Sequence, residues 1–260
     1  MGRLAVTLAL CLLAAAPAPA EPVRVAAAVS LKEALNEVAA AYRKEGRGDV
    51  TFTFGASGHL QAQIEYGAPI DAFISAGHKQ IDELARAGRA EAGSKRVVAG
   101  NRLVLVVPAG AQDPPTGLAG LADTRVRRLA VGEPKTVPAG QYAMQALAAA
   151  GVKDALKGRI VQGANVRQVL DYVERGEVDA GIVYATDAGA SGENVRVVET
   201  IPLKLHDPIE YPAAVVTDSR RRGAARAFLD YLSTPAARDL LTRRGFAVPS
   251  DDQAADRPGQ

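Results

Sequence analysis

Four segments of this chain repeat one local pattern, and the pattern restricts the folds that the chain can adopt. Each segment starts with an apolar, strand-like run, continues through a turn of small residues, and ends where an amphipathic helix begins. The four segments are residues 25–30, 52–58, 130–140 and 160–166. Strands that alternate with helices in this way predict an α/β fold with mostly parallel sheets flanked by helices.

The length of the chain and two further apolar runs predict two lobes. The chain has 260 residues, of which 48% are hydrophobic, enough for one large or two medium domains. The runs at 103–107 and 211–216 are natural crossover strands between two lobes. We therefore expect lobe I to comprise residues 21–104 and 210–249, and lobe II to comprise residues 105–209. Two crossings would leave a hinged cleft between the lobes.

The first 20 residues have the features of a secretory signal peptide. Arg3 supplies a basic start, residues 4–16 are apolar, and an A-x-A cleavage site ends at Ala20. Cys11 is the only cysteine of the sequence and lies inside this segment. A mature chain that begins after Ala20 would therefore contain neither disulfides nor a reactive thiol. We expect the protein to be secreted to the periplasm.

Charge and composition exclude several classes of function. The sequence has 31 Lys and Arg residues against 29 Asp and Glu residues, scattered along the chain, and only 5% aromatic residues. This distribution does not predict a nucleic-acid surface. His59, His78 and His206 lack the spacing of metal ligands, so neither a direct metal ligand nor a cofactor is expected. The polar residues 250–260 are expected to form a disordered tail.

The repeated helix starts suggest the chemistry of a binding site. A helix N-terminus presents unpaired N–H groups and a partial positive charge, so it is suited to an anion. If several such starts face one cleft, the chain can hold a small oxyanion without lysine or arginine. A shell that contains only donors suits a fully deprotonated dianion, whereas monohydrogen phosphate needs an acceptor. Glu133 and Asp187 are the only carboxylates near these turns. The pattern therefore favours molybdate, tungstate or sulfate over phosphate.

Several side chains near these turns also have purely structural interpretations. Ser30 and Glu33 form the S-x-x-E pattern of a capping box. Asn165 is expected to cap the helix that follows it. Arg167 is expected to lie exposed on a helix face, and His59 on the cleft rim or the surface, with neither acting as a ligand.

Six stretches of the sequence together resemble the periplasmic molybdate-binding proteins of ABC transporters. They include a Val-Pro-Ala-Gly segment and a Gly-Ile-Val-Tyr segment, and they follow the order of the family from about residue 23 to residue 249. The six are residues 27–31, 67–76, 131–134, 137–143, 181–184 and 211–216. The resemblance implies a two-lobed type II periplasmic-binding fold whose lobes are joined by two crossover strands.

The resemblance also implies a ligand, a set of contacts and a partner. Ser30 and Ser57 would each give a hydroxyl and a backbone N–H group. Ala139 and Val166 would give backbone N–H groups, and Tyr184 would give its phenol. These residues would bind molybdate, and tungstate as well, in a monomeric protein that delivers the anion to an ABC permease in the inner membrane.

Three other functions remain to be weighed. The chain could be a receptor for another fully deprotonated oxyanion such as sulfate, or an extracellular oxyanion sensor on the same fold. A serine hydrolase built on Ser57 is disfavoured, because the G-x-S-x-G pattern requires glycine where His59 stands. No enzymatic activity is therefore expected.

Overall fold

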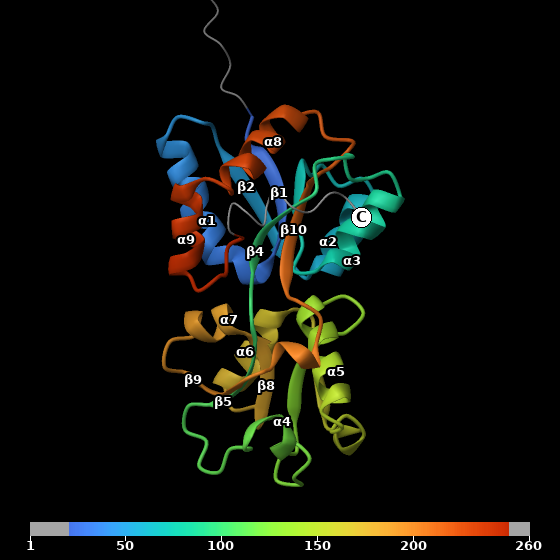
Figure 1. Ribbon diagram of the computed structural model, residues 1–260, viewed down its shortest axis with the longest axis vertical. Coiled ribbons are helices and arrows are strands. Elements are labelled where there is room, and N and C mark those ends of the chain that lie inside the picture. The colour runs from blue at the N-terminus through green and yellow to red at the C-terminus, as the bar shows by residue number, and fades with distance from the viewer. Residues whose placement is uncertain (1–20, 250–260) are drawn as a thin grey trace, which may run out of the picture.

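The computed structural model describes residues 21–249, so the predicted signal peptide (1–20) and the predicted tail (250–260) lie outside the described residues. Two bodies follow one another along the longest axis, each built on a five-stranded sheet with helices around it (Figure 1). We call the body that contains the N-terminal strand lobe I and the other lobe II. The two-lobed α/β architecture predicted from the sequence is confirmed.

Lobe I is built on a mixed sheet in the order β2-β1-β3-β10-β4, in which the first three strands are parallel and β10 is antiparallel to both of its neighbours. Its strands are β1 (Val23–Ala28), β2 (Val50–Gly55), β3 (Ala72–Ile74), β4 (Arg96–Gly100) and β10 (Glu210–Val215). Its helices are α1 (Lys32–Lys44), α2 (Ser57–Glu65), α3 (His78–Arg86), α8 (Arg222–Tyr231) and α9 (Pro235–Arg243), with a 3-10 turn η1 (Val29–Leu31) between β1 and α1.

Lobe II repeats this plan with the strand order β7-β6-β8-β5-β9, in which β5 is antiparallel to β8 and β9. Its strands are β5 (Leu103–Pro108), β6 (Leu129–Gly132), β7 (Ile160–Gly163), β8 (Ala180–Tyr184) and β9 (Val195–Thr200). Its helices are α4 (Gly117–Gly120), α5 (Pro138–Ala149), α6 (Val166–Glu174) and α7 (Ala185–Ala190), with 3-10 turns η2 (Asp154–Leu156) and η3 (Leu203–Leu205).

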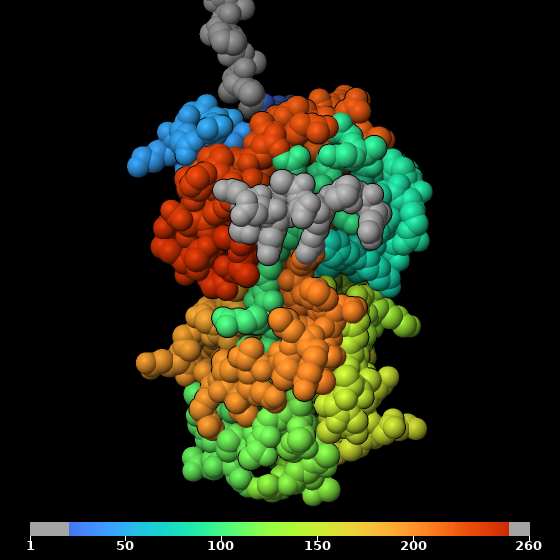
Figure 2. Space-filling model, in the orientation of Figure 1, coloured from blue at the N-terminus to red at the C-terminus, as the bar shows by residue number. Residues whose placement is uncertain are grey.

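The chain crosses between the lobes twice, at the waist that the space-filling view shows (Figure 2). It leaves lobe I between Gly100 and Leu103, and it returns between Thr200 and Glu210. The two apolar runs that were expected to cross between the lobes do not themselves cross. The first forms β5 in the sheet of lobe II, the second forms β10 in the sheet of lobe I, and each crossing immediately precedes its strand. A strand whose backbone is paired on both sides cannot serve as a hinge, so bending is left to the short segments between strands. The expected boundaries at 104 and 209 stay predictions.

One predicted helix cap is wrong and another is confirmed. Helix α1 begins at Lys32, after η1, and no side chain caps it, so Ser30 and Glu33 do not form a capping box. The 3-10 turn directs Ser30 into the protein, where its Oγ lies 3.0 Å from the hydroxyl oxygen of Tyr211. Asn165 does cap α6, since its Oδ1 accepts a hydrogen bond from the backbone N–H of Gln168.

Candidate functional site

A small cavity lies between the lobes and brings the predicted contact residues together. Its volume is about 10 Å³. The five residues predicted to contact an oxyanion all line it: Ser30, Ser57, Ala139, Val166 and Tyr184. Lobe I also contributes Ala28, Val29, Gly55, Ala56 and Ala76, and lobe II also contributes Val137 and Pro138. The contact of these residues with a ligand stays a prediction, but their convergence is a property of the fold.

Parallel strand pairing explains why these distant segments meet. In lobe I, Ala28 at the end of β1 pairs with Gly55 at the end of β2, so the turns that follow them are neighbours. In lobe II, Gly132 of β6 pairs with Gly163 of β7 in the same way. The carboxyl ends of parallel strands face the cleft in both lobes, which is the usual position of ligands in open α/β sheets.

Three helices therefore point their N-termini at the cavity. Ser57 is the first residue of α2, and Val166 is the first residue of α6. Helix α5 begins with Pro138, which has no N–H group, so Ala139 is the first residue of that helix able to donate. Such helix starts supply both unpaired donors and a positive potential to an anion.

The side-chain hydroxyl of Ser57 is oriented as a donor to the cavity. Its Oγ accepts a hydrogen bond of 3.0 Å from the backbone N–H of Ala76. The hydroxyl proton remains available, because a serine can accept and donate at once. Among residues 21–249 no histidine or carboxylate is hydrogen-bonded to Ser57, so the general base that a serine nucleophile requires is not in place.

Ser30 is oriented by a hydrogen-bond chain that sequence reasoning missed. The Nδ2 group of Asn101 donates to the hydroxyl oxygen of Tyr211 (3.0 Å), which lies 3.0 Å from Ser30 Oγ. Either hydroxyl can be the donor in this second bond, and when Tyr211 donates, the Ser30 proton is left for the cavity. Asn101 Nδ2 also donates to Thr186 Oγ1 of lobe II (2.8 Å), so the chain begins at the crossing between the lobes. Asn101 and Tyr211 are 110 residues apart in sequence, and no local pattern links them.

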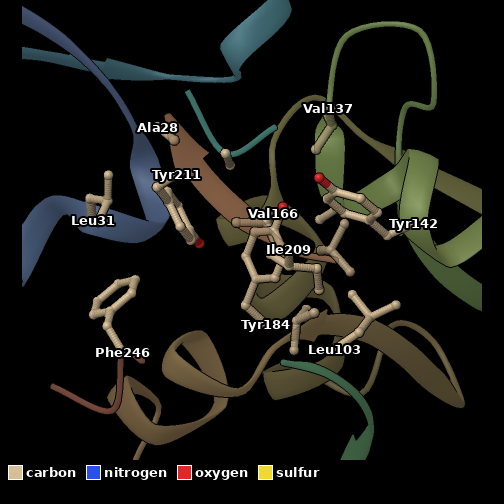
Figure 3. Packing of buried hydrophobic residues seen from close by; sticks show 14 of the residues in the cluster. Ala28, Leu31, Leu103, Val137, Tyr142, Val166, Tyr184, Ile209, Tyr211 and Phe246 are labelled. Atoms are coloured by element: carbon tan, nitrogen blue, oxygen red, sulfur yellow. The ribbon is translucent and has the colours of Figure 1, made fainter. Parts of the chain in front are cut away.

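Tyr184 brings to the cavity a polar atom that requires a partner. Its hydroxyl oxygen is buried and has no hydrogen-bond partner among the described residues. Burial raises the pKa of the phenol well above 10, so it stays protonated and can donate. Figure 3 shows its ring beside the side chains of Tyr211 and Val166. The ring centroids of Tyr184 and Tyr211 lie 6.0 Å apart.

Neither carboxylate that the sequence placed near the site lines the cavity. Glu133 accepts hydrogen bonds from Lys135 N–H and Thr136 Oγ1 in its own loop. Asp187 is fully buried, and its Oδ1 lies 2.7 Å from Nε of Arg167. The cavity lining thus offers hydroxyl and N–H donors without a charged acceptor. That arrangement favours a fully deprotonated anion over one that carries a proton.

The predicted exposure is wrong for Arg167 and confirmed for His59. Arg167 has a side chain only 23% exposed, because it is paired with the buried Asp187 in lobe II and with Glu33 in lobe I. A buried carboxylate needs such a counter-charge. His59 is exposed and does not line the cavity.

The cavity has a volume of only about 10 Å³, so its dimensions depend closely on how near the lobes lie to each other. Because the walls belong to both lobes, a small change in lobe separation enlarges the cavity. Within residues 21–249 no cluster of His, Cys, Asp and Glu could hold a metal ion, and no helix has the length and apolar character needed to cross a membrane.

Comparisons with known proteins agree with this architecture. Residues 23–247 match the family model for bacterial extracellular solute-binding proteins. The molybdate-binding protein ModA of Escherichia coli is 40% identical over 232 residues, which cover 87% of this chain and 89% of ModA. The structure of the periplasmic molybdate-binding protein of Azotobacter vinelandii superposes with a TM-score of 0.77 at 26% identity, covering 88% and 100% of the two chains. The sulfate-binding protein SubI of Mycobacterium tuberculosis also gives 0.77, covering 90% and 89%, but its 22% identity shows a shared fold alone.

Proposed function

Because this chain belongs to the bacterial extracellular solute-binding proteins, we propose that it binds molybdate in the periplasm and delivers it to the permease of an ABC transporter. The observation that carries the proposal is the interlobe cavity, where three helix N-termini, two serine hydroxyls and the unpartnered phenol of Tyr184 converge without a carboxylate. Tungstate, a dianion of the same shape, is proposed as a second ligand.

The proposed binding sequence follows from the division of the donors between the lobes. The anion first meets Ser30 and Ser57 on lobe I. Lobe II then closes and adds the N–H groups of Ala139 and Val166 and the phenol of Tyr184. Contacts that exist only in the closed state shift the population toward it, in proportion to the free energy they add.

Neutral donors can replace the hydration shell of a dianion. Removing water from such an ion is costly, and each hydrogen bond to a charged group contributes about 1.5–3 kcal/mol in return. Several such bonds are therefore needed. Serine hydroxyls and backbone N–H groups provide them without a cation, so release requires only that the lobes separate, with no chemical step.

The same donors would also hold sulfate, and a sulfate receptor is the second candidate function. The absence of a carboxylate from the cavity lining supports either dianion over monohydrogen phosphate. A sensor that binds the same oxyanion without transport would use the same site. The proposal also includes export through a signal peptide at residues 1–20, a monomeric state, recognition of the closed form by the permease and the lack of enzymatic activity.

The test is a calorimetric titration of residues 21–260 with molybdate, tungstate, sulfate and phosphate, each in a buffer free of the others. We expect strong heats for molybdate and tungstate and none for phosphate. Strong binding of sulfate with weak binding of molybdate would make sulfate the ligand. No measurable heat with any of the four anions would refute the proposed oxyanion site.

A variant assigns the binding to the cavity. Ser57→Ala removes one donor and leaves an anion oxygen unpaired. The free energy of molybdate binding should therefore weaken by about 1–3 kcal/mol, which raises the Kd roughly 5- to 150-fold. Ser233→Ala is a control on the surface of lobe I and should leave the Kd unchanged. Equal affinity of Ser57→Ala and wild type would take Ser57 out of the binding shell.

A further inference from the structure

Three charged side chains outside the cavity join the two lobes. Nη2 of Arg167 lies 2.6 Å from Oε2 of Glu33, and its Nε lies 2.7 Å from Oδ1 of Asp187. Glu33 belongs to α1 of lobe I, whereas Arg167 and Asp187 belong to α6 and α7 of lobe II. One guanidinium therefore makes a permanent pair inside lobe II and a second pair that exists only while the lobes are together.

Each member of this ion-pair chain follows a cavity residue closely in sequence. Arg167 comes directly after Val166, Glu33 lies three residues after Ser30, and Asp187 lies three residues after Tyr184. The ion pairs are thus fixed to the same turns that present donors to the cavity. A displacement of the guanidinium would move the starts of α6 and α7 relative to the serine turn of lobe I.

We propose that Arg167 is a positioning residue that holds the cleft closed through Glu33 and does not itself bind the anion. The inference rests on the proposed function. Two carboxylates neutralise the guanidinium, so it does not compete with the hydroxyl and N–H donors for a dianion. The pair with the fully buried Asp187 anchors the guanidinium, and the pair with Glu33 is the part that breaks on opening.

The surroundings of the Glu33 pair allow it to break and re-form. It borders an interlobe pocket of about 270 Å³, lined also by Ser30, Arg102 and Thr186. The Glu33 side chain is 36% exposed, so water and salt reach the pair, and its strength should fall as ionic strength rises.

A second interlobe contact closes the other side of the cleft. The backbone N–H of Gly58, at the start of α2, donates to the carbonyl oxygen of Thr136 in the loop before α5 (2.8 Å). In Figure 1, α2 and α5 lie on one side of the molecule, and α1 and α7 lie on the other. The ion pair and this hydrogen bond therefore restrain opposite edges of the cleft, with the cavity between them.

Helix α1 provides a matched control for the test. Glu37 lies one helical turn after Glu33, its side chain is equally exposed at 36%, and it is paired with Arg244, which is also in lobe I. Glu33→Gln breaks an ion pair between lobes and leaves the Arg167–Asp187 pair intact, whereas Glu37→Gln breaks one within a lobe. Both substitutions remove one negative charge, so their effect on the net charge is the same.

The experiment is stopped-flow measurement of molybdate association and dissociation for wild type, Glu33→Gln and Glu37→Gln. We expect Glu33→Gln to dissociate about 3- to 10-fold faster with an association rate within about twofold of wild type, and Glu37→Gln to match wild type in both. Raising the ionic strength should speed dissociation from wild type and bring it toward the rate of Glu33→Gln.

Each alternative result has a distinct meaning. Equal dissociation rates for the two variants would overturn the role of Arg167 while leaving molybdate binding in place. A slower association with unchanged dissociation for Glu33→Gln would also overturn it, because the pair would then act before closure. A wild-type protein that does not bind molybdate would overturn the proposed function itself, and this inference with it.

Discussion

The substitution Gly58→Ala should separate folding from cleft closure. Gly58 is the second residue of α2 and follows Ser57 directly. A Cβ at this position would lie 2.7 Å from Cα and 2.8 Å from the carbonyl oxygen of Thr136, both backbone atoms of lobe II. Carbon atoms in ordinary contact are about 3.5–4.0 Å apart, so the lobes must separate by about 0.7 Å or more at this edge.

That separation is large on the scale of hydrogen bonds. A donor placed about 2.8 Å from an anion oxygen would move to about 3.5 Å, where little of a hydrogen bond remains. If two charge-assisted bonds are lost, at about 1.5–3 kcal/mol each, the free energy of molybdate binding should weaken by about 3 kcal/mol or more. The Kd should then rise at least about 150-fold. The fold itself should not suffer, because alanine is favoured over glycine in a helix by about 0.5–1 kcal/mol.

The assay pairs calorimetric titration with thermal unfolding in the absence of ligand. Gly223→Ala is the control, since Gly223 is likewise the second residue of a helix, α8, and a Cβ there meets nothing within 4 Å. We expect Gly58→Ala to unfold at or above the wild-type temperature and to bind molybdate far more weakly, and Gly223→Ala to bind normally. Wild-type affinity in a well-folded Gly58→Ala protein would refute the reasoning that binding requires this degree of closure.

Three further substitutions test other parts of the argument. Tyr184→Phe should weaken molybdate binding by about 10- to 150-fold in titration while leaving the ligand-free protein as stable as wild type, because the lost hydroxyl is buried without a partner; a loss of stability would contradict this. Burial raises the pKa of Asp187 from 3.8 to about 6 against the opposing effect of Arg167, so the folded protein binds the extra proton and its free energy of unfolding should fall as pH rises from about 4 to 6. Urea titrations of Asp187→Asn should lack this contribution, which is at most about 3 kcal/mol, and parallel pH profiles would refute it. Gly140→Ala should destabilise by about 1–3 kcal/mol or more in urea titrations, because a Cβ would lie 2.0 Å from the carbonyl oxygen of Gly132; wild-type stability would show that α5 can shift on β6.

Local patterns predicted the elements of this fold well, and they failed where a residue's partner was remote. The alternation of Val50, Phe52 and Phe54 predicts a strand, and the structure has β2 there. Strand β4, which pairs with β10 and leads to the first crossing, carries only a short apolar stretch and was missed. The predicted capping box at Ser30 is wrong for a different reason. The Ser30 side chain is hydrogen-bonded to the hydroxyl of Tyr211, a residue remote in sequence, and does not cap the helix.

The candidate site shows the same division. The small-residue turns and the Pro-Ala-Gly helix start identified backbone donors from sequence, because a helix start is a local property. The environment of Arg167 could not be predicted, because its partners are remote in sequence. Glu33 lies 134 residues away in the other lobe, and Asp187 lies in α7, which is separated from α6 by strand β8. An arginine on an amphipathic helix is normally exposed, and only the packing of three elements makes this one an interlobe bridge.

The sequence by itself determined the α/β class, the positions of the helix starts and the chemical character of the donors, because these depend on periodicity, on glycine and proline, and on residue type. Tertiary structure alone decided which donors face one cavity, which hydroxyl groups have hydrogen-bond partners, and which charges are paired. Those properties depend on distances between residues that are far apart in the chain. Parallel strand pairing in each lobe and the two crossings at the waist set these distances.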